Sequence, residues 1–465
     1  MRPARLRTPL AATLTTLLAI TLVGSSGDVA GAEAPAAEAP AAAAVAAARN
    51  PVTPGNFRGY GFDQCLAPTQ AKMNSWLQHS PFLAVGIYIS GDSRACRHQP
   101  NLTPRWISTQ LSKGWRLLPI TLGPQASCQP RFPRYRDDFK ISPAPGGANR
   151  YPTARRMGVA EAIKTVKDAK ALGIVEGSTL WYDLEGFDVT NRHCRESALA
   201  FLSTWTQQLH KLNYVSGVYS SAGSGIKALD DARVNRPNAF KLPDRIWIAR
   251  WDGMANTSTS YIREDGWRPG RRVKQYQGGH DEVWGGVRIN IDRNYLDLGN
   301  GSKAPPETHC NGVNVNFTQY QALHPPAGDT VPPPSKVRAL QCLLKEKGVF
   351  GGKVSGIYNR ATITAVRAWQ TGRGFKASDN WSRRDWITLH THGNNPVLKV
   401  GSMGGYVRRV QRALNAANPA NKLTVSGVYD GRTSIAMRAY QTKLRLGGSG
   451  VTNFVTWPKL KAGRY

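Results

Sequence analysis

The sequence predicts an α/β protein, a (β/α)8 TIM-like barrel followed by two small all-α domains of three helices each. Three observations support this fold class. Residues 55–300 alternate apolar, strand-like runs with helical patterns, and eight such runs fit a closed barrel of about 250 residues. Acidic residues stand at the ends of several runs, where a barrel carries its chemistry. Residues 336–465 contain two copies of one helical pattern.

The predicted strands are short apolar runs bounded by turn residues. They cover residues 57–63, 83–89, 115–122, 178–186, 214–220, 245–251, 272–278 and 287–292. Helical patterns lie between them at 69–78, 103–113, 155–172 and 195–211. A doubly wound parallel sheet is the alternative arrangement, but the glycine fingerprint of that fold is missing from the sequence.

The N-terminal residues indicate export. Residues 1–32 combine three early arginines, the apolar core "PLAATLTTLLAITLVG" (9–24) and a small-residue site "AGA" (30–32), a pattern typical of a signal peptide. A membrane anchor is the alternative, but the apolar core is short for a transmembrane helix. Residues 33–54 read as an Ala/Pro-rich linker. We therefore expect a secreted protein, extracellular or associated with a cell wall.

Six cysteines in an exported chain predict disulfide bonds. Fifteen pairings are open, and domain membership favours Cys310 with Cys342 and the other four cysteines among themselves. These four are Cys65, Cys96, Cys128 and Cys194. No CxxC pair and no histidine spacing typical of a metal site is present, so we expect no metal and no cofactor.

The formal net charge of +31 is concentrated in the repeats. Residues 336–465 hold 23 Lys/Arg against 4 Asp/Glu, a charge of +19. A basic exported protein is attracted to polyanions, which outside a bacterial cell include anionic wall polymers. Solubility is the alternative reason for the charge. No nucleic-acid-binding motif is present, so nucleic acid is not an expected partner.

The barrel and the repeats are joined by a Pro-rich linker, residues 301–335. The repeat units are residues 336–395 and 396–465. "VRALQCLL" (337–344) matches "VRRVQRAL" (407–414), and "VSGIYNRATITAVRAWQ" (354–370) matches "VSGVYDGRTSIAMRAYQ" (425–441). "DWITL" (385–389) matches "TWPKL" (456–460). Each unit is predicted to form a helix, a turn, a helix and a short helix.

The stretch "GSTLWYDLEGFDV" (178–190) places Asp183 and Glu185 two residues apart at a strand end, so both side chains point to one side. Asp63 ends the first predicted strand and Asp292 the eighth. Neighbouring carboxylates raise one another's pKa, and glycoside hydrolysis needs a protonated carboxylic acid beside a second anionic group. The pattern therefore predicts catalytic acids. The alternative is an inactive constellation paired with arginines.

Four aromatic residues at strand ends could stack on sugar rings, with ordinary barrel packing as the alternative for each. They are Tyr88, Trp247, Trp251 and Tyr276.

With "GYGFDQCLAP", "YDLEGF", "IWIARW" and "INIDRNYL" in this order, residues 56–299 resemble a glycoside-hydrolase-like domain of secreted bacterial proteins. This domain is catalogued as domain of unknown function 1906 and is distantly similar to family 25 lysozymes. The resemblance implies that Asp63, Asp183, Glu185 and Asp292 are the family's strand-end acids. Glu185 would be the general acid, and Asp183 would steady an acetamido group or a cationic intermediate. Asp63 and Asp292 would position the substrate or tune Glu185.

The pattern of a leading "VxxLQ", then "SGxYxxxTxxAVRxxQ", then "TWxxL", which the two repeats follow closely, resembles the small three-helix peptidoglycan-binding domain. The resemblance implies a shallow binding groove near the turn and the second helix. It implies six contact residues there: Tyr358, Thr362, Gln370, Tyr429, Thr433 and Gln441. The alternative is that these residues cap and connect the helices.

Together these features predict a wall-binding protein whose barrel hydrolyses glycosidic bonds of peptidoglycan, a lysozyme- or muramidase-like activity. The expected partner is peptidoglycan or a related cell-wall glycan, with no membrane span after signal removal. The alternative is a non-catalytic, wall-associated protein with a degenerate barrel.

Overall fold

The computed structural model describes residues 50–129 and 138–465. The predicted signal peptide (1–32) and most of the predicted linker (33–54) lie outside the described residues. In the part of the chain that the structure describes, no helix is long and apolar enough to cross a membrane.

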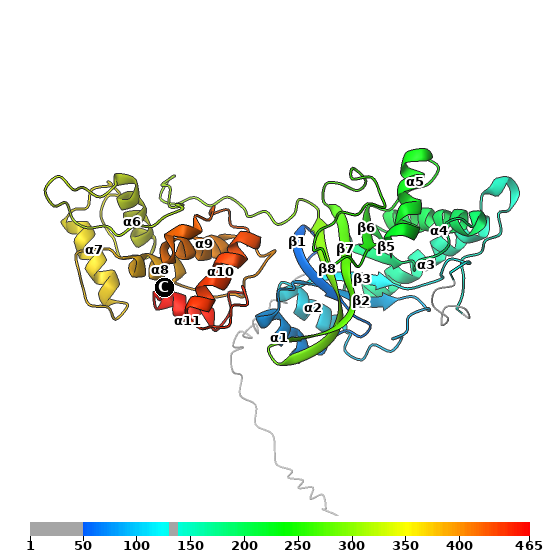
Figure 1. Cartoon of the computed structure of the whole chain (residues 1–465), viewed down its shortest axis with the longest axis horizontal. Helices are drawn as coiled ribbons and strands as arrows, with labels where there is room; N and C mark the ends of the chain where they lie inside the picture. The colour runs from blue at the N-terminus through cyan, green and yellow to red at the C-terminus, as the bar shows by residue number, and fades with distance from the viewer. Residues whose placement is uncertain (1–49, 130–137) are drawn as a thin grey trace, which may run out of the picture. The chain divides into compact units, whose positions relative to one another are not determined.

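Eight strands close into a barrel in chain order, which confirms the eight predicted strands. Figure 1 labels these strands in the barrel region. They are β1 (Phe57–Asp63), β2 (Ala84–Ser90), β3 (Arg116–Thr121), β4 (Thr179–Asp183), β5 (Val215–Ser221), β6 (Arg245–Ala249), β7 (Arg271–Trp284) and β8 (Val287–Leu298). Neighbouring strands from β1 to β7 run parallel.

Helices connect the first six strands. They are α1 (Gln70–His79), α2 (Pro104–Ser112), α3 (Pro152–Ala171), α4 (Arg192–Lys211) and α5 (Lys227–Asn235), with short helical turns η2 (Gly147–Asn149) and η3 (Ala222–Ile226). Polar side chains cap several helix starts: Thr69 accepts a hydrogen bond from the Lys72 amide, and Asn191 accepts one from the Cys194 amide. These caps fix where each helix leaves the loop that follows its strand.

The last part of the barrel departs from the predicted regular (β/α)8 pattern. β8 runs antiparallel to both β7 and β1. β7 and β8 are longer than predicted and form one hairpin across Gly285 and Gly286. Residues 250–270, all of which the structure describes, form a loop and not a helix between β6 and β7. The short turn between β7 and β8 accounts for the reversed direction, because a parallel connection requires a crossover of a dozen or more residues.

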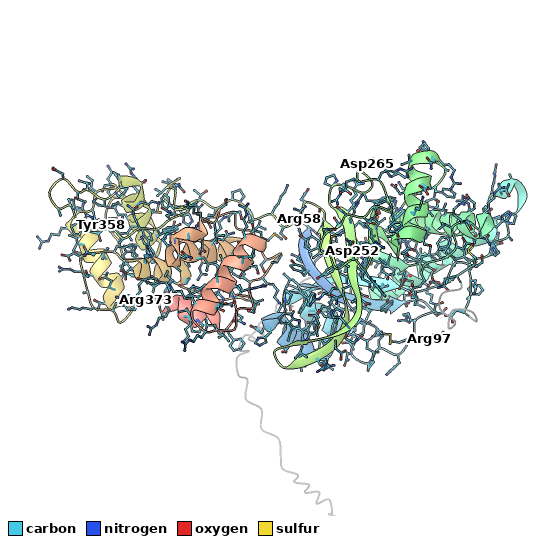
Figure 2. All side chains as sticks on the ribbon, in the orientation of Figure 1. Arg58, Arg97, Asp252, Asp265, Tyr358 and Arg373 are labelled. Atoms are coloured by element: carbon cyan, nitrogen blue, oxygen red, sulfur yellow. A yellow bond between two sulfur atoms is a disulfide. The ribbon has the colours of Figure 1, made fainter. Side chains whose placement is uncertain are left out.

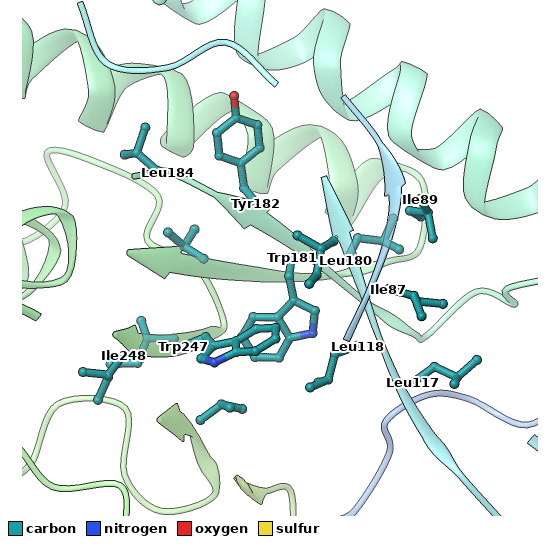
Figure 3. Packing of buried hydrophobic residues seen from close by; sticks show 14 of the residues in the cluster. Ile87, Ile89, Leu117, Leu118, Leu180, Trp181, Tyr182, Leu184, Trp247 and Ile248 are labelled. Atoms are coloured by element: carbon teal, nitrogen blue, oxygen red, sulfur yellow. The ribbon is translucent and has the colours of Figure 1, made fainter. Parts of the chain in front are cut away.

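The interior of the barrel is filled by aromatic rings. Trp181 on β4 and Trp247 on β6 are buried, with ring centroids 5.6 Å apart in an edge-to-face arrangement. Figure 3 shows these two rings together in the barrel, with Tyr182 pointing the opposite way, toward the helices. Gly217 on β5 leaves room for this packing, because an added Cβ would lie 2.4 Å from the Trp181 ring. The strand alternation thus places Trp181 directly below the acidic strand end.

Three disulfides staple the loops and the linker. They join Cys65 with Cys96, Cys128 with Cys194, and Cys310 with Cys342. This pairing agrees with the expectation from domain membership. The first bridge ties the loop after β1 to the loop after β2, so it supports the rim of the barrel that carries Asp63.

Residues 334–465 fold into helices that repeat in order. The helices are α6 (Pro334–Glu346), α7 (Arg360–Thr371), α8 (Arg383–Thr391), α9 (Gly405–Ala417), α10 (Gly431–Lys443) and α11 (Thr456–Lys461), with the turn η4 (Pro419–Asn421). Asn359 caps α7 and Asp430 caps α10 at matching positions of the two copies. Buried aromatic residues, among them Trp386 and Trp457, form the helical core.

Candidate active site

Asp63 and Asp292 meet because β8 is antiparallel. Asp63 is the last residue of β1, and the register pairs it directly with Asp292 in β8. The prediction placed Asp292 at the end of the eighth strand, but β8 continues to Leu298. The residue reaches the acidic end of the barrel from within a reversed strand. Asp292 therefore lies beside Asp63, but from a position inside β8 and not from the end of that strand.

A buried glutamine holds the backbone between the other two acids. Gln125, fully buried, accepts a hydrogen bond from the Glu185 amide at 2.9 Å through Oε1. Its Nε2 donates to the Asp183 carbonyl at 2.9 Å and to the Gly123 carbonyl at 3.1 Å. These hydrogen bonds hold the backbone of the turn after β4 and so fix the point from which the Glu185 side chain projects.

The four acids surround two tyrosines. The Tyr88 hydroxyl donates to Asp183 Oδ2 at 3.2 Å, and Asp183 is buried. Burial together with the charges of Glu185, Asp183, Asp63 and Asp292 raises the pKa of Tyr219 well above its usual value. Because all four carboxyl groups act on one phenol, the structure brings the four predicted acids together at one end of the barrel.

Glu185 lies where two cavities meet. The first, of about 280 Å³, is lined by Asp63, Tyr88, Arg94 and Asp292 beside Glu185. The second, of about 290 Å³, is lined by Tyr219, Arg250, Trp251 and Tyr261 on the other side of Glu185. Asp183 lines neither cavity and lies in the buried layer below. Glu185 is half-buried and lines both cavities. Its carboxyl group could therefore act on a bond of a ligand that occupies both cavities.

The two paired aspartates have raised pKa values. Burial is the main cause for Asp63 and raises its pKa to about 6, although hydrogen bonds from Asn294, Gln275 and Asp292 oppose the increase. Burial, the charge of Asp63 and the hydrogen bond to it raise the pKa of Asp292 to about 8, and the charge of Glu185 adds to this. Near neutral pH the pair therefore holds one proton between two carboxyl groups.

The loop after β6 presents aromatic rings to the second cavity. Trp251 is 62% exposed and Tyr261 is 41% exposed, and the Arg250 guanidinium lies 5.2 Å from the centre of the Tyr261 ring. Asp252, labelled in Figure 2, does not join the acids, because its carboxylate accepts a hydrogen bond from the buried Lys274 at 2.7 Å. This ion pair anchors the loop and so orients Trp251.

Two of the predicted sugar-stacking residues are in the interior. Trp247 is 1% exposed and donates its indole N–H to Asn294, and Tyr276 is 6% exposed. Barrel packing, the alternative considered from the sequence, describes their positions. Tyr88 and Trp251 do line the cavities.

The six repeat residues are buried. Tyr358, which Figure 2 labels, donates to the Asp379 carbonyl at 2.7 Å, and Gln370 joins the Ser378 amide to the Asn380 carbonyl. The other four are Thr362, Tyr429, Thr433 and Gln441, each no more than 1% exposed. These contacts lie within each repeat, so the geometry favours the capping and connecting role over direct contact with a polymer.

A surface groove nevertheless exists on the second repeat. A cavity of about 570 Å³ lies beside α10 and the η4 turn, and its lining includes Lys422, Asp430, Arg432 and Ile435. Ile435 is 68% exposed. An exposed apolar side chain next to basic groups gives this groove the composition of a binding surface.

Sequence reasoning missed the amide side chains of the site. Gln125, Gln275 and Asn294 are all buried and all contact the acids or their backbone. Gln275 and Asn294 lie in strands that hold many other polar residues, so the sequence does not single them out. The same holds for Gln125, which lies in the long loop after β3.

A family model matches most of the barrel region. Residues 74–296, somewhat less than half of the chain, match the family described as "Rv2525c-like, glycoside hydrolase-like domain". The matched segment includes Asp183, Glu185 and Asp292, and it begins after Asp63. A comparison with curated proteins gives no match. The resemblance of the repeats to peptidoglycan-binding domains stays a prediction.

Three solved structures are similar to part of the chain. An uncharacterized protein of B. stearothermophilus is 19% identical, covers 51% of this chain and 95% of its own, and has a TM-score of 0.31. The modular autolysin LytC of Streptococcus pneumoniae is 12% identical, with coverages of 51% and 46% and a TM-score of 0.31. The spore cortex-lytic enzyme SleL of Bacillus megaterium QM B1551 is 8% identical, with coverages of 53% and 66% and a TM-score of 0.27.

Proposed function

We propose that this chain is a secreted, wall-binding glycoside hydrolase that cleaves glycosidic bonds of peptidoglycan. The observation that carries the proposal is the position of Glu185 between two cavities, next to an aspartate pair that holds one proton. The match of residues 74–296 to a glycoside-hydrolase-like domain supports the same class of chemistry. The three disulfides support an oxidising, extracellular location.

Glu185 is the proposed general acid. A glycan chain would occupy both cavities, so that the scissile oxygen lies at Glu185. Glu185 protonates this oxygen as the bond to the anomeric carbon breaks, and the resulting carboxylate later takes a proton from the attacking water. The proton that Glu185 gives to the leaving oxygen is replaced by the proton that it takes from water, so the reaction needs no cofactor.

Asp183 is the proposed stabilising carboxylate. It lies in the buried layer below Glu185 and carries a hydrogen bond from Tyr88. A carboxylate in a water-poor layer stabilises nearby positive charge more strongly than one in water. This position suits electrostatic support of a cationic intermediate, or of an acetamido group that attacks its own anomeric carbon. Trp251 and Tyr261 would hold the sugar in the second cavity.

The repeats are proposed to bring the barrel to the wall. Their charge of +19 attracts anionic wall polymers, and the groove beside α10 offers an exposed isoleucine to a glycan. The six buried repeat residues would support this groove without touching the ligand.

The test is release of soluble muropeptides from purified, teichoic-acid-free peptidoglycan by the mature protein and by Glu185→Gln. We expect release by the first protein and not by the second, with both proteins still pelleting with the wall. Gln277→Leu is a matched control, because Gln277 lies on the same barrel and contacts Arg293 rather than the acids. Pelleting without release by any variant would instead support the non-catalytic, wall-associated role.

A further inference from the structure

Asp63 lies between two side-chain amides. Gln275 Nε2 is 3.2 and 3.3 Å from the two carboxylate oxygens, and Asn294 Nδ2 is 2.6 Å from Oδ1. Both amides are buried, at 3% and 0% exposure. An N–H group can only donate, and a protonated carboxyl would have to place its own proton among these donors. These hydrogen bonds therefore favour the ionised form of Asp63 and oppose the burial that raises its pKa.

Indole groups fix the direction of both amides. Trp247 Nε1 donates to Asn294 Oδ1 at 2.8 Å, and Trp251 Nε1 donates to Gln275 Oε1 at 2.9 Å. An indole N–H has no acceptor, so it can face only the oxygen of an amide. The –NH2 end of each amide must then point to Asp63. Two parallel chains, indole to amide to carboxylate, thus converge on one residue.

Asp292 has the opposite surroundings. Burial, the charge of Asp63, the hydrogen bond to Asp63 and the charge of Glu185 all oppose its ionisation. Both aspartates line the first cavity beside Glu185, but Asp292 is half-buried whereas Asp63 is only 4% exposed. Of the two paired carboxyl groups, Asp292 is therefore the more exposed to a ligand.

We propose that Gln275 and Asn294 are positioning residues that hold Asp63 as the carboxylate, so that the proton of the pair resides on Asp292. The Asp292 O–H then donates to the Asp63 carboxylate, which leaves the other Asp292 oxygen as an uncharged acceptor for a ligand in the first cavity. Such an uncharged acceptor recognises a neutral donor, which in an N-acetylated sugar is the acetamido N–H or a hydroxyl. The recognition of a sugar by Asp292 rests on the proposed function, whereas the location of the proton on Asp292 does not.

Other titratable groups lie near the aspartate pair, but they do not remove the difference in ionisation between Asp63 and Asp292. Glu185, from the turn after β4, and Asp183, at the end of β4, add negative charge. Tyr88 on β2 and Tyr219 on β5 have pKa values well above the usual range because of burial and these carboxylates, so both stay neutral. Arg94, from the loop after β2, lines the same cavity. The donors specific to Asp63 remain the two amides.

The proton can be located without any measurement of activity. Selectively ¹³C-carboxyl-labelled aspartate in the full chain would be titrated by NMR in Asp292→Asn and in Asp63→Asn. Each variant leaves one carboxyl of the pair, facing an equivalent introduced amide. We expect the remaining Asp63 to titrate at a lower pH than the remaining Asp292. The reverse order would overturn the proposal.

The role of the amides is tested in the Asp292→Asn background. Adding Asn294→Leu or Gln275→Leu removes donors from Asp63, and we expect each to raise the pKa of Asp63 by about one unit or more. Adding Gln277→Leu, on the same strand as Gln275, should leave it unchanged. An unchanged pKa after loss of both amides, with the barrel folded by circular dichroism, would contradict the proposal. Failure of peptidoglycan hydrolysis would leave these titrations unaffected, so the two proposals fail separately.

Discussion

Asp292 faces Asp63 across the seam between β1 and β8, in direct register and joined by a hydrogen bond between their carboxyl groups. The contact exists because β8 returns antiparallel after a tight hairpin. Two acidic residues separated by more than 200 positions thereby act as one titrating pair beside Glu185.

The pair predicts a pH dependence of stability. The folded pKa of Asp292, about 8, lies above the value near 3.9 of an unfolded chain, so its contribution to stability is present at low pH and is lost as pH rises from about 4 to about 8. Asp292→Asn should therefore be more stable than the parent at pH 9, by at least about 1.4 kcal/mol for one unit of pKa, and less so at pH 5. Urea unfolding at both pH values measures this difference.

Asp265→Asn provides the control of opposite sign. Hydrogen bonds from Arg233 lower the pKa of this exposed carboxylate, so its removal should reduce stability at pH 7 and have no effect well below pH 4. A uniform stability change for Asp292→Asn across pH 5–9 would contradict the assignment of a raised pKa.

Gly86 on β2 sets the space for Asp63. A Cβ at this position would lie 2.6 Å from the Asp63 Cβ and 3.2 Å from the Trp247 ring. Gly86→Ala should therefore cost about 1–3 kcal/mol of stability and displace Asp63 from its amides. Gly147→Ala is the control, because nothing lies within 4 Å of its added Cβ. Thermal unfolding of both variants is the measurement, and equal melting temperatures would refute the close approach.

Trp251 is expected to bind sugar and to orient Gln275. Trp251→Ala should raise the half-saturating concentration of soluble peptidoglycan fragments about tenfold, because it removes the exposed ring from the second cavity. Trp251→Phe keeps a smaller aromatic ring and loses the indole N–H that donates to Gln275, so its affinity should change less than that of Trp251→Ala. Met254→Ala, also exposed and on the same loop but lining neither cavity, should bind as the parent does. Calorimetric titration distinguishes the three variants.

Two repeat variants should have contrasting effects. Gln441→Leu removes hydrogen bonds to the Gly450 amide and the Val451 carbonyl and should cost about 1–3 kcal/mol of stability. Ile435→Ser changes an exposed residue of the α10 groove and should weaken pelleting with the wall while the melting temperature stays the same. If Ile435→Ser pellets with the wall as the parent does, and only the destabilised Gln441→Leu loses pelleting, the wall contact lies elsewhere.

Much of the barrel was predictable because its strands are apolar runs with sharp boundaries. β1 begins and ends at the predicted residues, and the Asp-x-Glu strand end led directly to Asp183 and Glu185. The direction of β8 is missed from the sequence because the seventh predicted strand ends at residue 278, so Gly285 and Gly286 do not stand out as a two-residue hairpin turn. That reversal is what pairs Asp292 with Asp63.

The remaining misses concern burial. Trp247 and Tyr276 lie on predicted strands, but both side chains are buried and line neither of the two cavities beside Glu185. The repeated sequence pattern identifies Tyr358 and Gln370. It does not show whether these side chains line a binding groove or pack in the helical core. Buried amides such as Gln125 act through contacts distant in sequence, which only the folded chain brings together.

The central claim, hydrolysis at Glu185, is tested most directly by digesting purified peptidoglycan in H₂¹⁸O. A glycosidase adds water to the anomeric carbon, so mass spectrometry should find one ¹⁸O at each new reducing end produced by the parent protein. Glu185→Gln should produce no labelled ends at a comparable rate, since loss of a general acid costs about 10²–10⁴-fold in rate. Equal labelling by both proteins, or no new reducing ends from the parent, would contradict the account.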